Sequence, residues 1–223
     1  MQAGVSDRSD QEAGKESRIE IRWGEEMMSM KSVDFLIAGI GGQGTVVASD
    51  ILSDVGSESG YDVKKSDILG LAVRGGSVVS HVRWAEQVRA PMIEEGTAHF
   101  LVGFEWLETL RRLSYVNAKG TIVVNDCRLD PITVSSGEAD YPGKETILTE
   151  LKKAARKVYV IPGLQTALDI GNARTLNIVV MGALSRLLEP SPSLWEEIVR
   201  KRVPKKLVDL NLDAFRKGRG LIK

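Results

Sequence analysis

The sequence predicts an α/β fold, organised as a three-layer α/β/α sandwich around a mixed, mostly parallel sheet. The main observation is that, from residue 33 onward, short apolar runs alternate with segments whose apolar residues recur at helical spacing. A second observation is the segment 77–84, in which apolar and polar residues alternate and which follows a loop without a helix. Such alternation is typical of an antiparallel or edge strand, so the sheet is not expected to be purely parallel.

Each expected element depends on a local pattern. Gly60 is expected to stop the first helix, the apolar run 120–125 predicts a central strand, and Pro162 ends the last strand. Asn172 is a candidate N-cap, while Gly182 predicts close packing inside a long apolar helix. The expected strands are 33–38, 61–68, 77–84, 98–103, 120–125 and 158–161. The expected helices are 43–60, 105–115, 146–157, 172–188 and two surface helices, 194–203 and 205–216.

A domain boundary is expected at the end of residues 1–31. This segment is rich in Ser, Gly, Glu and Asp, has little periodicity, and carries seven acidic and five basic side chains. Such a segment has too little apolar surface to form a core, so we expect a flexible extension. Residues 32–223 are expected to form one domain, because 43% of the chain is hydrophobic and 223 residues can enclose one substantial core.

Composition excludes several classes of protein. Lysine plus arginine and aspartate plus glutamate number 30 each, which argues against a general nucleic-acid binder. One cysteine, Cys127, cannot form a disulfide within the chain or hold an iron–sulfur cluster by itself, and two histidines make a built-in zinc site improbable. No apolar stretch approaches the roughly 20 residues of a membrane span. We therefore expect a cytoplasmic protein that does not bind membranes.

The motif GIGGQG, residues 39–44, lies between the first expected strand and the first expected helix. Gly39, Gly41 and Gly44 have the GxGxxG spacing, and a helix N-terminus offers free N–H groups to an anion. A dinucleotide site also needs an acidic residue about 20 positions later, for which Asp62 and Asp67 are candidates. Three interpretations stay open: a nucleotide site, a site for another anion or polar ligand, and a tightly packed turn.

A second glycine motif is formed by Arg74, Gly75 and Gly76, before the expected strand 77–84. Paired glycines allow unusual backbone conformations, and an arginine on such a loop can reach a carboxylate or phosphate. The alternative is a surface arginine before a turn. Cys127 and His81 are interpreted as structural residues, so no catalytic residue and no metal ligand is expected.

The C-terminal segment 200–223 is strongly basic. It contains nine basic and two acidic side chains on stretches that also carry apolar residues. Two interpretations are comparable: solvated helix ends, where cations are favourable, and an amphipathic surface that docks on an acidic partner.

Five segments together resemble a known family. In chain order they are GIGGQGTVVASDIL, LGLAVRGGSVVSHVRW, VGFEWLETLRRL, TIVVND and GNARTLNIVVMGALSRLLEP. This series resembles the gamma subunit or domain of pyruvate, ketoisovalerate and other 2-oxoacid:ferredoxin oxidoreductases, and most resembles the beta subunit of indolepyruvate ferredoxin oxidoreductase. The resemblance departs at Leu69 and Val73, where that branch tends to have histidine and glutamine, so the 2-oxoacid stays open.

The resemblance implies a subunit of a larger enzyme rather than an enzyme active alone. Thiamine diphosphate, Mg and [4Fe–4S] clusters are then expected on a catalytic partner subunit, with coenzyme A as co-substrate and ferredoxin as electron acceptor. The complex would oxidatively decarboxylate indolepyruvate or a related aryl or branched 2-oxoacid to an acyl-CoA. In this chain the resemblance implies cofactor or subunit contacts at both glycine motifs: Gly39, Gly41, Gly42, Gln43, Gly44, Arg74, Gly75 and Gly76. The alternative is a free-standing Rossmann-like oxidoreductase that binds a dinucleotide at GIGGQG.

Overall fold

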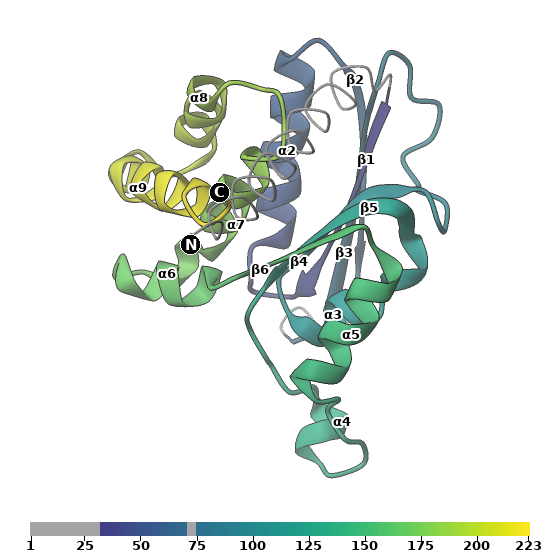
Figure 1. The fold of residues 1–223 in the computed structure, drawn as a ribbon. Helices are drawn as coiled ribbons and strands as arrows, with labels where there is room; N and C mark the ends of the chain where they lie inside the picture. Colours follow the sequence, from purple (N-terminus) through teal and green to yellow (C-terminus); the bar gives the residue numbers. More distant parts are fainter. Residues whose placement is uncertain (1–31, 71–74) are drawn as a thin grey trace, which may run out of the picture. The chain divides into compact units, whose positions relative to one another are not determined.

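The computed structural model describes residues 32–70 and 75–223, which form a six-stranded sheet with helices on both faces (Figure 1). The strand order is β2-β3-β1-β4-β5-β6. Strand β3 runs antiparallel to β1 and β2, whereas β1, β4, β5 and β6 are parallel. This confirms the predicted α/β sandwich with a mixed, mostly parallel sheet. The strands are β1 Ser32–Ile40, β2 Asp62–Leu69, β3 Ser77–Ala85, β4 Ala98–Gly103, β5 Val116–Asn125 and β6 Lys157–Ile161.

Two helical layers cover the sheet. Helices α2, α6, α7, α8 and α9 lie on one face and α3 and α5 on the other, while α4 projects beyond the sheet (Figure 1). In the described part of the chain the α-helices are α2 Thr45–Glu58, α3 Trp106–Leu110, α4 Ile132–Ser135, α5 Lys144–Ala154, α6 Gly163–Asp169, α7 Leu176–Ser185, α8 Pro192–Arg202 and α9 Val208–Arg219. Three 3₁₀ turns accompany them: η1 Leu113–Tyr115, η2 Ala173–Thr175 and η3 Lys205–Leu207.

Strand β3 is antiparallel, as predicted, but it is not an edge strand. It lies between β1 and β2, and its polar residues have buried partners rather than solvent. Ser80 Oγ donates to Asp67 at 2.5 Å, and His81 Nδ1 accepts the Ile93 N–H at 3.1 Å. The polar residues that alternate along this strand therefore form hydrogen bonds inside the protein, and their presence does not mark an edge strand.

The backbones of helices α7 and α9 are in close contact. Every residue of α7 is buried, and a Cβ built on Gly182 would lie 2.2 Å from the Phe215 carbonyl oxygen of α9. A Cβ on Gly218 would lie 2.1 Å from the Val179 carbonyl oxygen of α7. The close packing expected at Gly182 is thus present. The two helices expected on the surface, α8 and α9, are half-buried, because Trp195 and Phe215 stack on each other in the core.

Several helix boundaries differ from the expected ones. The helix expected over 105–115 ends at Leu110 and continues as the 3₁₀ turn η1. Asn172 caps η2, by accepting the Arg174 N–H, rather than α7. The short helices α4 and α6 were not predicted, because four and seven residues give too little apolar periodicity.

Candidate functional site

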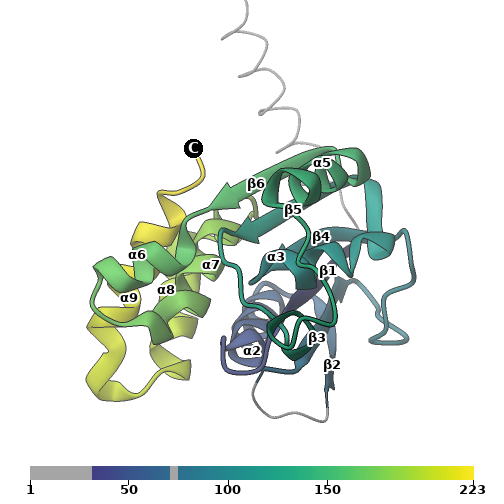
Figure 2. The same ribbon diagram turned by 90° about the horizontal axis from the view of Figure 1, so that it is seen from below.

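The candidate site lies at the edge of the sheet where β1, β4, β5 and β6 end, which we call the carboxyl edge; Figure 2 looks onto this edge. Helix α2 leaves β1 toward one face of the sheet, and α3 leaves β4 toward the other (Figure 2). Because β1 and β4 are neighbours, the two chain segments depart in opposite directions from adjacent strand ends. Open α/β sheets bind ligands at such a switch in chain direction.

Gln43 lies between these two chain segments. Its side-chain Oε1 accepts the Ile40 N–H at 2.8 Å, and its Nε2 donates to the Phe104 carbonyl oxygen at 3.2 Å. One amide therefore connects the end of β1 to the segment that follows β4. Both polar atoms of this side chain form hydrogen bonds within the chain, so Gln43 holds these two segments together.

The glycines of GIGGQG have two different physical roles. Gly42 and Gly44 have φ values of 106° and 79°, which favour glycine over residues with a Cβ. A Cβ on Gly39 would lie 2.9 Å from Phe104 Cβ, and one on Gly44 would lie 2.9 Å from Asn177 Nδ2. Nothing lies within 4 Å of the Cβ position of Gly42. Gly39 and Gly44 are therefore required by packing, whereas Gly42 presents open backbone.

The first turn of α2 begins directly after this loop. Its N-cap is Gly44, which has no side chain to accept a hydrogen bond, and the first turn of this helix carries no acidic residue. Helix N-terminal N–H groups without such acceptors carry a partial positive charge. The α2 terminus is thus electropositive at the carboxyl edge.

The two glycine motifs are in direct contact. Gly41 N–H donates to the Gly76 carbonyl oxygen at 2.8 Å, and Gly75 N–H donates to the Gly41 carbonyl oxygen at 3.3 Å. Gly75 has a φ of 77° and open space at its Cβ position. The structure therefore brings Gly75 and Gly76 to GIGGQG, while Arg74 lies outside the described residues.

A buried glutamate supports the second motif from the opposite helical layer. Glu108 of α3 is buried and accepts a hydrogen bond from Ser77 Oγ at 2.5 Å. Its other oxygen pairs with Arg111. Ser77 directly follows Gly76, so α3 fixes the point where this loop enters β3.

The sequence comparison identifies the family. The model for pyruvate ferredoxin/flavodoxin oxidoreductases matches residues 34–221, which include the whole carboxyl edge. The chain belongs to this family. The resemblance drawn from the five sequence segments is thereby confirmed.

Curated relatives of this family member are subunits of oxidoreductases. The chain is 34% identical over 196 residues to indolepyruvate oxidoreductase subunit IorB of Thermococcus kodakarensis, covering 85% of this chain and 95% of the relative. It is 33% identical over 188 residues to IorB of Archaeoglobus fulgidus, covering 83% and 93%. It is 27% identical over 191 residues to 2-oxoglutarate synthase subunit KorC of Methanothermobacter marburgensis, covering 83% and 94%.

Solved structures share the fold. Pyruvate oxidoreductase subunit PORC of Thermotoga maritima matches with a TM-score of 0.65 at 19% identity, covering 86% of this chain and 97% of that one. The gamma subunit of a keto/oxoacid ferredoxin oxidoreductase from Geobacter sulfurreducens matches with a TM-score of 0.61 at 23% identity, covering 85% and 97%. The α/β architecture is therefore that of these small subunits.

Sequence reasoning missed an amide relay that crosses the carboxyl edge of this family member. Asn125, buried at the end of β5, donates from Nδ2 to the Phe104 carbonyl oxygen at 3.0 Å. Its Oδ1 accepts the Leu164 N–H at 3.0 Å, at the start of α6. Gln43 and Asn125 thus share one acceptor and connect three strand ends. A polar residue closing an apolar strand was the available signal, but its partners depend on the strand order.

Glu105 anchors a projecting arm, which we define as residues 126–144. Glu105 is fully buried; it accepts the Glu108 N–H at 2.9 Å and the Leu129 N–H at 3.2 Å, and Tyr141 donates its hydroxyl to the same carboxylate. Burial first, and then the Glu105 carboxylate, raise the pKa of Tyr141 well above its usual range. Tyr141 is therefore a neutral donor that holds the arm to α3.

The two ends of the arm are joined by Asp126 and Lys144. Asp126 accepts from Lys144 Nζ at 2.6 Å and from Trp106 Nε1 at 3.0 Å. Burial opposes ionisation of Asp126, but these two donors hold its pKa below the usual value. Burial, with Glu105 and Asp126, raises the pKa of Cys127, so this buried thiol is not activated as a nucleophile. This agrees with the structural role expected for Cys127.

The acidic residues considered for a dinucleotide site are engaged elsewhere. Asp67 pairs with Lys65 at 2.8 Å and accepts from Ser80 and Ser49, while Asp62 accepts the Val88 N–H at 2.8 Å. Both residues lie on β2, which β3 separates from β1. In a dinucleotide-binding sheet the ribose-binding acid follows the strand next to the glycine loop. The geometry therefore disfavours that interpretation of GIGGQG.

The basic C-terminal segment packs on its own chain. Arg202 pairs with Asp54, Lys201 with Glu197, Arg216 with Glu196, and Lys217 with Asp213. Leu212 and Phe215 are buried in the helical layer. The apolar face of α9 is thus already covered, which argues against its docking on a partner as an amphipathic surface.

Two general properties concern the described residues alone. Within 32–70 and 75–223, no group of three or more His, Cys, Asp or Glu side chains is placed to hold a metal ion. None of the helices in these ranges is long and apolar enough to cross a membrane.

Proposed function

We propose that this chain is the non-cluster-bearing subunit of a thiamine-diphosphate-dependent 2-oxoacid:ferredoxin oxidoreductase. Its carboxyl edge would contact the catalytic partner subunit or a ligand held between the two. The proposal is supported by the family membership and by the similarity to IorB and KorC subunits. One cysteine cannot supply the four thiolates of a [4Fe–4S] cluster, so the clusters would belong to the partner.

The observation that carries the proposed contact surface is the joining of the two glycine motifs. Gly42 and Gly75 both present backbone without a neighbouring side chain, and the hydrogen bonds of Gly41 hold the loops together. Open backbone beside the electropositive α2 terminus suits an acceptor group on another molecule, such as a carbonyl, carboxylate or phosphate.

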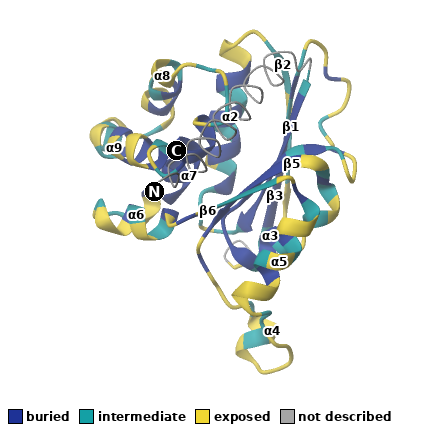
Figure 3. Ribbon diagram, in the orientation of Figure 1, coloured by how far each residue is buried: buried dark blue, intermediate teal, exposed yellow. Residues whose placement is uncertain are grey.

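Apolar side chains at the same edge favour a protein surface as the neighbour. Ile68 and Leu69 at the end of β2 are 49% and 63% exposed, a few residues before the second glycine motif. Ile132 on the arm is 86% exposed, and helix α4, to which it belongs, is largely exposed (Figure 3). Large exposed apolar side chains at the ends of these segments are typical of a surface that another protein covers.

Within the complex, this chain's residues would position rather than react. Thiamine diphosphate on the partner would supply the electron sink for decarboxylation. Gln43 and Asn125 would keep the carboxyl edge in a fixed shape, and the glycine loops would bring backbone donors to the interface. The expected substrate is an aryl or branched 2-oxoacid such as indolepyruvate, with coenzyme A and ferredoxin as co-substrate and acceptor. The complex would be cytoplasmic, and residues 1–31 would be an extension outside the domain formed by 32–223.

The proposal is tested by co-expressing the full chain with its catalytic partner from the same host. The purified complex should reduce ferredoxin with a 2-oxoacid and coenzyme A, whereas the chain alone should not turn over. Turnover by the isolated chain, or tight binding of NAD to the isolated chain, would contradict the proposed function.

Arg74 provides the sharper test of the loop. Arg74→Ala should leave the folding of the chain intact and lower the turnover of the complex, because the guanidinium is expected to reach an anionic group at the interface. Arg89→Ala, in the exposed loop after β3, is the matched control and should leave turnover unchanged. Unchanged turnover in Arg74→Ala would reject a functional role for this arginine.

A further inference from the structure

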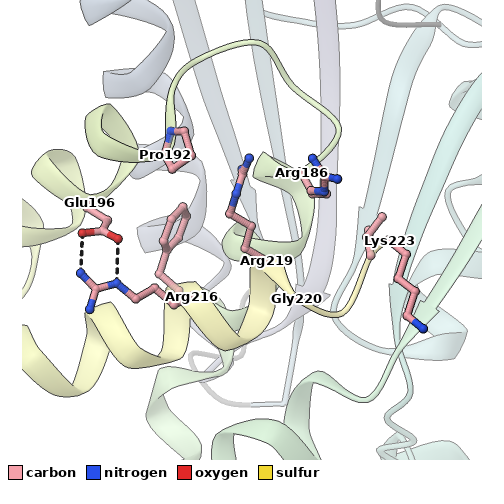
Figure 4. Close-up of a pocket in the computed structure, with 9 residues that line it drawn as sticks. Arg186, Pro192, Glu196, Arg216, Arg219, Gly220 and Lys223 are labelled. Atoms are coloured by element: carbon pink, nitrogen blue, oxygen red, sulfur yellow. Dashed lines mark hydrogen bonds and ion pairs between the residues drawn. The ribbon is translucent and has the colours of Figure 1, made fainter. Parts of the chain in front are cut away.

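A surface cavity of about 380 Å³ lies between α7, α8, α9 and the C-terminal segment (Figure 4). It is separate from the carboxyl edge, because Asn177 packs on Gly44 near the start of α7 whereas Arg186 follows the end of that helix. Asn177 and Arg186 are nine positions apart, which corresponds to about 14 Å along an α-helix. The volume is in the range of small-molecule sites, roughly 300–1,000 Å³.

The side chains that line the cavity carry an excess of positive charge. Four are cationic, Arg186, Arg216, Arg219 and Lys223, and one is a carboxylate, Glu196. Glu196 is fully used by Arg216, which donates to it from Nε and Nη2 at 2.8 Å each (Figure 4). Three cationic side chains thus remain without a carboxylate partner in the described part of the chain.

Arg219 is held in place. Its Nη1 donates to the Ser185 carbonyl oxygen at 2.9 Å and to Ser185 Oγ at 3.0 Å, so it caps the C-terminal end of α7. Its Nε and Nη2 have no acceptor among the residues described. Burial first, and then the nearby Arg186 guanidinium, lower the pKa of Arg219. Two guanidinium groups therefore lie near each other in the lining of one cavity, and neither has a carboxylate partner among the described residues.

The floor of the cavity is apolar. Phe215 and Ile222 line it although both are buried, and Pro192 forms part of its rim. A ligand could thus place a charged group on the arginines and an apolar group on this floor. This combination distinguishes the cavity from the exposed lysines of η3, which are not among the residues that line it.

We propose that the cavity binds the phosphate group of a small organic phosphate, with Arg186 and Arg219 as the phosphate-contacting residues. Guanidinium groups bind phosphate through parallel, charge-assisted hydrogen bonds, and two of them can satisfy a dianion. A concave site with an apolar floor fits a small molecule better than an acidic segment of a partner protein, which would need an extended surface.

Inorganic pyrophosphate is the probe for the test. The melting temperature of the full chain is measured against pyrophosphate concentration at constant ionic strength, so that general charge screening does not change along the titration. We expect a saturable rise in melting temperature. Arg186→Gln should weaken binding at least about tenfold, because it removes a charge-assisted contact. Arg186 is exposed and has no side-chain partner among the described residues, so this variant should still fold.

Arg89→Gln is the matched control, because it removes the same charge from an exposed position outside the cavity. It should change pyrophosphate affinity by less than about twofold. Three outcomes would overturn the proposal: no saturable rise, equal weakening by Arg186→Gln and Arg89→Gln, or stabilisation by a glutamate-rich peptide but not by pyrophosphate.

Discussion

Glycines have opposite roles in two regions of this molecule. Between α7 and α9, Gly182 and Gly218 are required because a Cβ would come within about 2 Å of the facing backbone. At the carboxyl edge, Gly42 and Gly75 have positive φ values and nothing within 4 Å of their Cβ positions. The first pair is explained fully by packing inside the chain. The second pair leaves backbone open to another molecule.

This difference gives a physical criterion for separating structural glycines from site glycines. A glycine that touches its own chain is needed for folding, whatever the protein does. A glycine with open space at its Cβ position is needed locally only for its backbone conformation, so a large effect of its substitution on assembly would indicate a contact with a partner.

The largest effect is expected in the helical layer. Gly218→Ala would place a Cβ 2.1 Å from the Val179 carbonyl oxygen, and neither helix can move apart without opening the core. We expect the free energy of unfolding to fall by about 3 kcal/mol. Chemical denaturation measures the change. Gly220→Ala is the control, since its Cβ would lie 3.4 Å from the nearest atom, and it should cost less than about 0.5 kcal/mol. Similar losses in both variants would contradict the packing argument.

A smaller effect is expected from the Gln43 link between the end of β1 and the segment after β4. Gln43→Leu removes the acceptor of the Ile40 N–H and one of the two donors to the Phe104 carbonyl oxygen. Because Asn125 still serves Phe104, the main cost is one unpaired N–H, and we expect a loss of about 2 kcal/mol. The control Gln165→Leu removes an exposed hydrogen bond to Asp169 and should change stability by less than about 0.5 kcal/mol. If Gln43→Leu is equally neutral, the amide does not hold the edge.

Two glycines with positive φ separate a contact with a partner from a purely conformational requirement. Gly42 at the carboxyl edge and Gly96 in the loop before β4 have φ values of 106° and 75°, with nothing within 4 Å of either Cβ position. Replacing either by alanine should cost about 1 kcal/mol of stability, because the left-handed conformation becomes strained. Only Gly42→Ala should also weaken the association with the catalytic partner, measured as the dissociation constant of the complex. Equal association in both variants would contradict a contact at Gly42.

Much of the fold followed from local sequence patterns. Local patterns located all six strands of the described sheet, segment 77–84 by its alternation of apolar and polar residues, and strand 98–103 has the predicted bounds. The internal position of β3 was not predictable, because it depends on pairing with the distant strand β1 as well as with its sequence neighbour β2. Helices α4 and α6 were missed because they are too short to show periodicity.

The sequence predicted the candidate site only where glycines mark an unusual backbone conformation or a close approach. The motifs at 39–44 and 75–76 were located by that signal, and their mutual hydrogen bonds were not expected. Asn125 and Glu105 act through partners that strand order brings together, so no spacing in the sequence could identify their roles. The contact role of the glycine loops, including Arg74, remains a prediction.

The smallest expected effect is the pH dependence of the free energy of unfolding, which should arise from residues outside both glycine regions. The two histidines of the chain, His81 on β3 and His99 on β4, each accept a backbone N–H at Nδ1, from Ile93 at 3.1 Å and from Asp34 at 3.0 Å. Protonation would remove both acceptors. Burial first lowers the pKa of each imidazole; Arg112 and Arg83 lower that of His81 further, whereas at His99 the lowering by Arg83 is opposed by Asp34.

Because the folded-state pKa of each histidine lies below its ordinary value, the unfolded chain binds more protons as the pH falls below about 6.5. The stability linked to these groups should therefore be complete above that pH and be lost progressively toward the folded-state pKa values. We expect the free energy of unfolding to decrease between pH 7.5 and pH 5.5, and the decrease to flatten in the double variant His81→Gln, His99→Gln. Glutamine can still accept a hydrogen bond but does not titrate, so it separates protonation from the loss of the contact. If the free energy of unfolding of the double variant still falls with pH as steeply as before, other groups control the pH dependence. If Gly42→Ala changes that slope by the same amount as the double variant, the pH dependence arises at the carboxyl edge.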